Sequence, residues 1–184
     1  MKDTFIIGLA GAGGAGKDTV ARLLGFTSIA FAGPLKVGLA AMGFPEPENR
    51  ELKEEIVEGY TFTWRKAAQT LGTEWGRMLD PEIWLSIAKQ RRVRSPLPVI
   101  SVTDVRFHNE ADWVRNYGLL VHVVGRNTSV KAEHVGHASE HGLRQQPADW
   151  QIDNSGDMEQ LNRSVDLLRA TVIQRISRGS NAQV

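Results

Sequence analysis

Apolar residues in this chain form short, nearly continuous runs, separated by longer stretches in which they recur every three or four positions. The clear runs are residues 5–9, 99–102 and 119–124, with weaker ones at 28–31 and 150–153. Strands covered on both faces of a parallel sheet have this continuous character, whereas strands with one solvent-facing side alternate. The pattern predicts a mainly parallel sheet that is buried on both sides.

Helical periodicity fills most of the intervals between these runs. The predicted helices span residues 17–24, 34–42, 64–71, 81–92 and 109–117, and a last one starts at residue 157. Pro34 suits a first helical turn, and Gly118 is expected to end its helix as a left-handed glycine. Alternating strands and helices predict an α/β fold, a three-layer sandwich in which ligands bind at the carboxyl ends of the strands.

The last helix has the clearest pattern of all. Asp157 and Gln160 are spaced as a capping box at its start. The apolar stripe that follows consists of Met158, Leu161, Val165, Leu168, Val172 and Ile176. A stripe with this spacing is expected to pack against the core, and the polar residues 177–184 are expected to form a flexible tail.

The bulk properties favour a single domain over residues 1–184. Two polar stretches inside it, 43–63 and 125–147, are long enough to be functional loops. A net charge of +1 argues against a broad nucleic-acid-binding face, and the absence of cysteine excludes disulfides and thiolate zinc sites. Since no apolar run reaches membrane-spanning length, we expect a cytoplasmic protein with no nucleic-acid or membrane partner.

A glycine-rich motif follows the first predicted strand. It reads Gly11-Ala-Gly-Gly-Ala-Gly16-Lys17-Asp18-Thr19. Glycines let backbone N–H groups approach a polyphosphate, the next helix points its positive end at the anion, and Lys17 can reach the β- and γ-phosphate oxygens. This is the layout of a P-loop, except that Asp18 stands where a Mg²⁺-binding Ser or Thr usually follows the lysine.

Further charged residues stand at predicted strand ends and helix starts. The run 99–102 leads to Asp104, which resembles a Walker-B carboxylate that could hold Mg²⁺ directly or through water. The alternative is that Asp104 caps a turn or pairs with a nearby cation. The candidate cations for a second phosphate group are Lys36, Arg65, Arg77, Arg106 and Arg126.

Taken together, these motifs resemble the phage-type deoxynucleoside monophosphate kinases. The matching segments are Gly-Lys-Asp-Thr-Val-Ala at 16–21, Phe-Ala-Gly-Pro-Leu-Lys at 31–36, Arg65-x-x-x-Gln69-x-x-Gly72-Thr73-Glu74, Trp84, Thr-Asp-Val-Arg-Phe-x-Asn-Glu-Ala at 103–111, and His137-x-Ser139-Glu140. They occur in the family's order, from residue 5 to the end of the last helix. The resemblance implies a nucleoside monophosphate kinase fold, the cofactors ATP and Mg²⁺, a deoxynucleoside monophosphate substrate and a homodimer.

The resemblance also implies roles for individual residues. Catalysis would involve Lys17, Asp104, Arg106 and Arg126, and the ATP phosphates would be held by Gly13, Gly14, Ala15, Gly16, Lys17, Asp18 and Thr19. The acceptor would be bound by Lys36, Arg65, Gln69, Glu74, Arg106 and Glu140, and Mg²⁺ by Asp18, Thr19 or Asp104, directly or through water. Residues 43–63 would form the monophosphate-binding insertion and 125–147 the lid. Because the segment between Lys36 and Arg65 is short for the family, base preference cannot be carried over.

Two other functions fit the same P-loop. One is a kinase of another small metabolite, such as dephospho-coenzyme A, in which Asp18 or Asp104 would be the base for a hydroxyl acceptor. The other is a nucleotide-binding switch protein, in which slow hydrolysis drives a conformational change. The convergent arginines and the predicted lid favour a second phosphorylated ligand over a partner surface.

Overall fold

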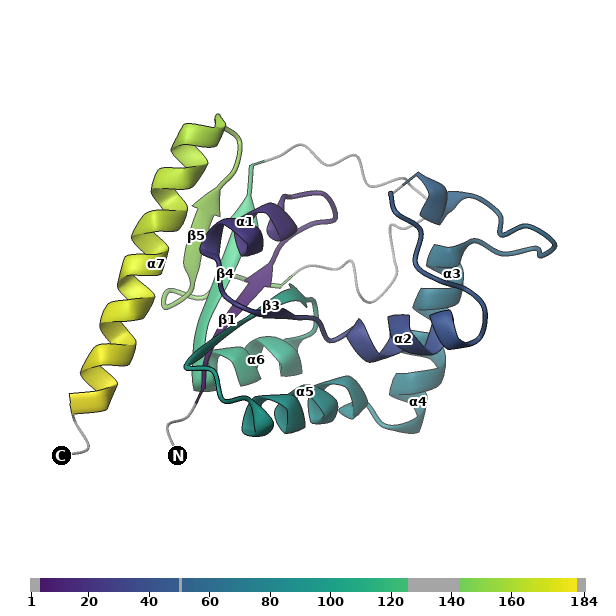
Figure 1. The fold of residues 1–184 in the computed structure, drawn as a ribbon, viewed down its shortest axis with the longest axis horizontal. Helices are drawn as coiled ribbons and strands as arrows, with labels where there is room; N and C mark the ends of the chain where they lie inside the picture. Colours follow the sequence, from purple (N-terminus) through teal and green to yellow (C-terminus); the bar gives the residue numbers. More distant parts are fainter. Residues whose placement is uncertain (1–3, 50, 126–142, 182–184) are drawn as a thin grey trace. The chain divides into compact units, whose positions relative to one another are not determined.

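The computed structural model describes residues 4–49, 51–125 and 143–181 (Figure 1). The chain divides into two compact units. The sheet unit comprises Met1–Ile29 and Arg92–Val184, and the helical unit comprises Ala30–Arg91. The predicted insertion 43–63 lies within the helical unit. A single functional domain over the whole chain stays a prediction.

The sheet unit contains five parallel strands in the order β2-β3-β1-β4-β5 (Figure 1). They are β1 (Phe5–Ala10), β2 (Ser28–Ile29), β3 (Val99–Val105), β4 (Gly118–Val124) and β5 (Trp150–Asp153). The predicted parallel sheet is confirmed, although the run 28–31 forms a strand over two residues only. The strand stops because a turn follows at once, in which the N–H of Gly33 donates to the carbonyl of Ala30.

Helices cover both faces of this sheet, as the three-layer prediction requires. On one face, α1 (Lys17–Leu24) and α7 (Met158–Asn181) bury a core that includes Ile7 and Leu9 of β1. On the other face lies α6 (His108–Tyr117), whose Val114 packs directly against Gly8. Neighbouring residues of a strand point to opposite faces of the sheet. Ile7 and Leu9 therefore face α1 and α7, whereas Gly8 faces α6.

Helix α7 confirms the predicted capping box and most of the predicted stripe. Asp157 Oδ1 accepts from the N–H of Gln160 at 2.8 Å, and Gln160 Oε1 accepts from the N–H of Asp157 at 3.3 Å. The buried stripe residues are Leu161, Val165, Leu168 and Val172. α7 continues to Asn181, into the stretch predicted as a flexible tail, and the flexibility of that stretch stays a prediction. Backbone hydrogen bonds propagate a helix past the end of its apolar face.

Gly118 has a different role from the predicted left-handed helix end. Its φ is 177°, which is extended backbone that any residue can adopt. It opens β4 opposite Ile6, and a Cβ atom there would lie 1.8 Å from the Ile6 carbonyl oxygen. Glycine is needed at this position because two strands meet there at close range, not because the chain turns.

The helical unit begins with α2 (Gly33–Ala41), in which Pro34 occupies the first turn as predicted. A 3₁₀ turn (Leu52–Glu54) precedes a longer helical stretch. That stretch consists of α3 (Trp64–Gln69), the π-helix η2 (Thr70–Gly76) and α4 (Arg77–Leu79), and is followed by α5 (Ile83–Arg94). The helix predicted over 64–71 therefore continues to Leu79, because the π-helix η2 connects α3 directly to α4.

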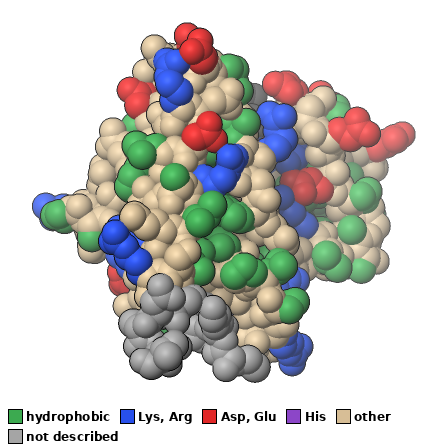
Figure 2. All heavy atoms as spheres, turned by 60° about the vertical axis from the view of Figure 1, so that its left-hand side comes forward, with side chains coloured by type: hydrophobic (Ala, Val, Ile, Leu, Met, Phe, Trp, Pro, Cys, Tyr) green, Lys and Arg blue, Asp and Glu red, His purple; other side chains and the backbone are tan. Residues whose placement is uncertain are grey.

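The outer side of α7 carries both charged and apolar side chains. Ion pairs join Arg163 to Glu159 and Arg169 to Asp166, and Leu167 and Ile173 are exposed. The face seen in Figure 2 likewise shows hydrophobic side chains among acidic and basic ones. Among the described helices, none has the length and apolar character needed to cross a bilayer.

Candidate active site

The P-loop connects β1 to α1, as the sequence predicts. Gly14 has φ 83° and Gly16 has φ 97°, both in the left-handed region where a side chain would be strained. The N–H of Ala15 donates to the carbonyl of Ala12 and closes the turn. Gly16 is the N-cap of α1 and has no capping side chain. A helix start of this kind, with glycine as its N-cap, is the part of a P-loop that binds an anion.

The ammonium group of Lys17 folds back over the loop. Its Nζ atom donates to the carbonyl oxygens of Gly11 at 2.8 Å and Ala12 at 2.9 Å. These bonds place a positive charge beside the loop's own main chain. The geometry suits a phosphate held between backbone amides and an ammonium group.

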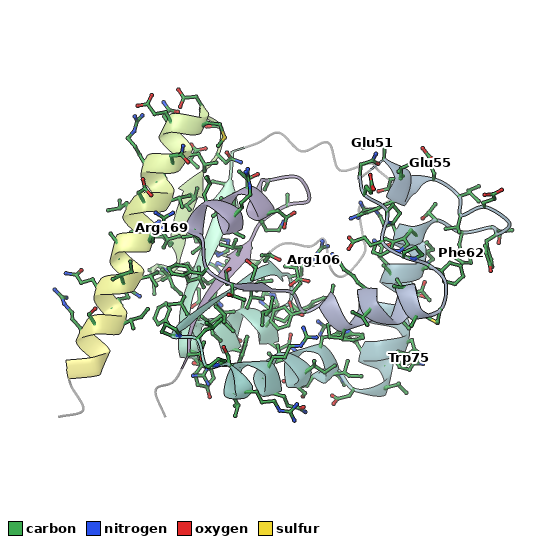
Figure 3. All side chains as sticks on the ribbon, viewed as in Figure 1. Glu51, Glu55, Phe62, Trp75, Arg106 and Arg169 are labelled. Carbon is green, nitrogen blue, oxygen red and sulfur yellow. The ribbon has the colours of Figure 1, made fainter. Side chains whose placement is uncertain are left out.

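The far end of α1 is tied to α7. Arg169 extends from α7 toward α1 (Figure 3). It donates through Nε to the Leu24 carbonyl at 3.1 Å and through Nη2 to the Leu23 carbonyl. Gly25, with φ 73°, ends the helix in a left-handed cap. A cation at the C-terminus complements the helix dipole, so α1 is stabilised at the end opposite the P-loop.

A local irregularity in β3 sets the position of Asp104. Gly8 of β1 is aligned with Val102 of β3, but Ala10 is aligned with Val105. Two steps along β1 thus match three along β3, so β3 carries an extra residue around Asp104. Such bulges redirect side chains and are common beside active sites. Asp104 is half-buried and lies within β3, at the sheet edge from which the P-loop also emerges.

Arg106 follows directly after β3 and is labelled in Figure 3. Its backbone N–H donates to Glu110 Oε2 at 2.9 Å, and the N–H of Phe107 donates to the same oxygen at 3.1 Å. Glu110 is 1% exposed. A buried carboxylate on α6 therefore fixes the main chain on which Arg106 is carried.

The predicted magnesium ligands fit the way proteins bind this ion. Asp18 is exposed in the first turn of α1, Thr19 follows it, and Asp104 lies on the adjacent strand edge. Across the described part of the chain, no group of three or more His, Asp or Glu side chains is arranged to hold a metal. This is compatible with Mg²⁺, which is usually bound by one or two protein groups together with waters and substrate phosphates.

Solved structures with a similar fold include kinases. A gluconokinase from Sinorhizobium meliloti has a TM-score of 0.50 at 16% identity, with 98% of this chain and 99% of that chain covered. The Thermus thermophilus protein TT1252 has a TM-score of 0.54 at 20% identity, with 93% and 99% covered. At these identities the likeness shows the fold alone.

Sequence comparisons decide the family. The family model for deoxynucleotide monophosphate kinase matches residues 42–165. The chain belongs to this family. A deoxynucleoside-5′-monophosphate kinase from Escherichia phage T5 is 35% identical over 99 residues, a match that covers 49% of this chain and 40% of that protein. The chain thus spans less than half the length of this curated relative.

Two cationic acceptor-binding residues implied by the family resemblance, Lys36 and Arg65, lie in the helical unit and are held in ion pairs. Lys36 on α2 contacts Glu46 at 3.0 Å, and Lys53 contacts the same carboxylate at 2.6 Å. Arg65 on α3 pairs with Glu54. Burial alone would raise the pKa of Glu46, but hydrogen bonds and positive charge from Lys53 and Lys36 outweigh it and lower that pKa.

Two further acceptor-binding residues predicted for this kinase family member, Gln69 and Glu74, also lie in the helical unit. Gln69 is half-buried at the end of α3, and Glu74 is exposed on the π-helix, 3.2 Å from Lys66. Arg126 and Glu140 lie outside the described residues. The sheet unit therefore brings together the P-loop, Asp104 and Arg106 along one sheet edge, whereas Lys36, Arg65 and Arg77 belong to the helical unit.

Three residues that hold the sheet unit together were missed by sequence reasoning. Glu110 was quoted only as part of a motif, although its spacing from Phe107 is that of a capping-box glutamate. Asn154 binds the P-loop from the end of β5, a contact across 139 residues that no local pattern signals. Asp149 joins α6 to β4, as described below.

Proposed function

We propose that this chain transfers the γ-phosphoryl group of ATP to a deoxynucleoside 5′-monophosphate and gives the diphosphate. The observation that carries the proposal is the P-loop, with Lys17 beside its main chain, in a chain whose residues 42–165 match the kinase family. The T5 relative's name gives the substrate class. ATP and Mg²⁺ are the proposed cofactors.

In this proposal the sheet unit binds the donor. Backbone amides from Gly13 to Thr19 hold the ATP phosphates, and Lys17 leaves the Gly11 and Ala12 carbonyls to steady the migrating group. Bound Mg²⁺ would supply positive charge to the phosphate oxygens, held by Asp18, Thr19 or Asp104 directly or through water. Arg106 and Arg126 stabilise the charge that develops during transfer.

The helical unit supplies most of the acceptor's binding groups. Lys36 and Arg65, with Arg106, bind its phosphate. Gln69 and Glu74 lie near its sugar or base, and Glu140 of the lid is a further acceptor-binding residue. Lys36 and Arg65 are already paired with carboxylates, those of Glu46 and Glu54. The acceptor's phosphate would take the place of these carboxylates beside the two cations. The acceptor oxygen is itself anionic, so alignment and charge neutralisation are required rather than a strong base.

An acceptor panel tests the proposal. ATP consumption is measured by a coupled assay with each deoxynucleoside monophosphate, with a coenzyme A precursor and with no acceptor. Stimulation by at least one deoxynucleoside monophosphate is expected. Stimulation by the coenzyme A precursor alone, or hydrolysis that needs no acceptor, would contradict the proposal.

A matched pair of variants tests the P-loop itself. Lys17→Ala is expected to lower turnover by about 100-fold or more while the protein remains folded, because a charge that contacts the transferred group is lost. Lys89→Ala removes an exposed lysine of α5 that pairs with Glu82 and is expected to change turnover less than about twofold.

We also propose that the protein is cytoplasmic and forms a homodimer. Light scattering of the purified protein would test the homodimer.

A further inference from the structure

Asn154 connects three segments that meet beside the P-loop. It directly follows β5, and its backbone N–H donates to the Val124 carbonyl at the end of β4 at 2.8 Å. Its side-chain Nδ2 donates to the Ala15 carbonyl at 2.8 Å. The residue is 3% exposed. A buried amide therefore joins the loop to the two strands that lie beyond β1.

The bond to Ala15 fixes the direction of one peptide unit in the loop. A trans peptide is planar, so its C=O and N–H groups point in opposite directions. While Asn154 holds the Ala15 carbonyl, the N–H of Gly16 must point away from Asn154. That N–H belongs to the segment that precedes α1 and is one of the amides expected to contact a phosphate.

The fit between Asn154 and the loop is tight. A Cβ atom at Gly16 would lie 2.2 Å from Asn154 Nδ2, so only glycine allows the side chain to reach the loop. Within the described part of the chain, no group donates a hydrogen bond to the buried Oδ1 atom. An apolar side chain would fill the space without the cost of a half-satisfied amide, so packing alone does not account for asparagine here.

We propose that Asn154 is a positioning residue that holds the P-loop in the shape that binds the donor phosphates. The proposal rests on the proposed function, since it assigns ATP to this loop. Asn154 acts through the Ala15–Gly16 peptide and does not contact the nucleotide. Its loss affects binding of ATP and leaves binding of the acceptor unchanged.

The test compares Asn154→Ala with Asn162→Ala, an exposed asparagine on α7. Equilibrium binding of ATP and the KM values for ATP and for the acceptor are measured, together with thermal unfolding. Asn154→Ala is expected to raise the Kd for ATP about tenfold with less than a twofold change in the acceptor KM. Asn162→Ala is expected to leave all of these within twofold.

Two outcomes separate the possible failures. If Asn154→Ala unfolds at a lower temperature but binds ATP as wild type does, the positioning role is refuted. If wild-type protein itself does not bind ATP, the proposed function fails instead. Should Asn154→Ala not fold, Asn154→Asp keeps the shape of the side chain but replaces the N–H₂ donor to the Ala15 carbonyl by an acceptor oxygen, and an unchanged Kd for ATP in that variant would equally refute the proposal.

Discussion

Replacement of Asp149 by asparagine should destabilise the sheet unit, because this carboxylate joins three parts of it. Arg115 of α6 donates to both carboxylate oxygens, at 2.9 and 2.8 Å, and His122 of β4 lies 3.1 Å away. The backbone N–H of Gln146 donates at 2.8 Å. Asparagine has a single acceptor oxygen and presents an N–H₂ group to donors, so these contacts cannot all be kept.

The size of the effect follows from the pKa of Asp149. Burial alone would raise this pKa, but the hydrogen bonds from Arg115, Gln146 and His122 outweigh burial and lower it from 3.8 to about 2. Each pH unit corresponds to about 1.4 kcal/mol, so ionised Asp149 contributes roughly 2–3 kcal/mol to the free energy of unfolding. The side chain is 1% exposed, so solvent screens this contribution little.

The pH dependence gives a second check on the same interaction. Because the folded pKa lies below the unfolded one, the stabilisation is complete above the unfolded pKa of about 4 and is lost as the pH falls through about 2. Urea unfolding of wild type and Asp149→Asn is therefore expected to differ by about 2–3 kcal/mol at pH 7 and to converge in acid. A difference below about 1 kcal/mol at pH 7 would refute the reasoning. Glu159→Gln, at an exposed ion pair with Arg163, is the control and should cost less than about 0.5 kcal/mol.

Other substitutions test single contacts by thermal or urea unfolding. Gly118→Ala is expected to cost more than about 3 kcal/mol or to prevent folding, since its Cβ would collide with the Ile6 carbonyl. Gly38→Ala, in α2 with open space around it, is expected to stabilise the protein by about 0.5–1 kcal/mol, and equal effects at the two glycines would show that backbone freedom, not close approach, governs both. Glu110→Ala removes the acceptor shared by two backbone N–H groups and is expected to cost about 2–3 kcal/mol, whereas wild-type stability would show that those groups find other partners.

Much of the fold could be predicted because it depends on local patterns. Continuous apolar runs predicted the buried strands, and the spacing of Leu161, Val165 and Leu168 predicted the buried side of α7. The P-loop could be recognised because glycine spacing and a following lysine are both local in sequence. These features need no knowledge of which distant segments meet.

The parts that could not be predicted depend on distant contacts. Gly118 resembles a helix-ending glycine in sequence, but its requirement comes from Ile6 on a neighbouring strand. The bulge near Asp104 is set by register against β1, and the role of Asn154 depends on a bond across 139 residues. In each case the partner lies far away along the chain, so no window of residues contains the cause.

The π-helix η2 makes the helical unit sensitive to chain length in a particular way. Its wide turn holds more residues than an α-helical turn, and its Gly72 carbonyl accepts the Trp84 indole N–H at 2.7 Å. Because a π-turn holds one more residue than an α-turn, deleting one residue within Thr70–Gly76 would let the segment close into a regular α-helix while α4 keeps its orientation. Deleting one residue from α3, a regular helix, would instead rotate everything after it by about 100°. The loss of a single residue should therefore do less harm in the π-helix than in the α-helix that precedes it.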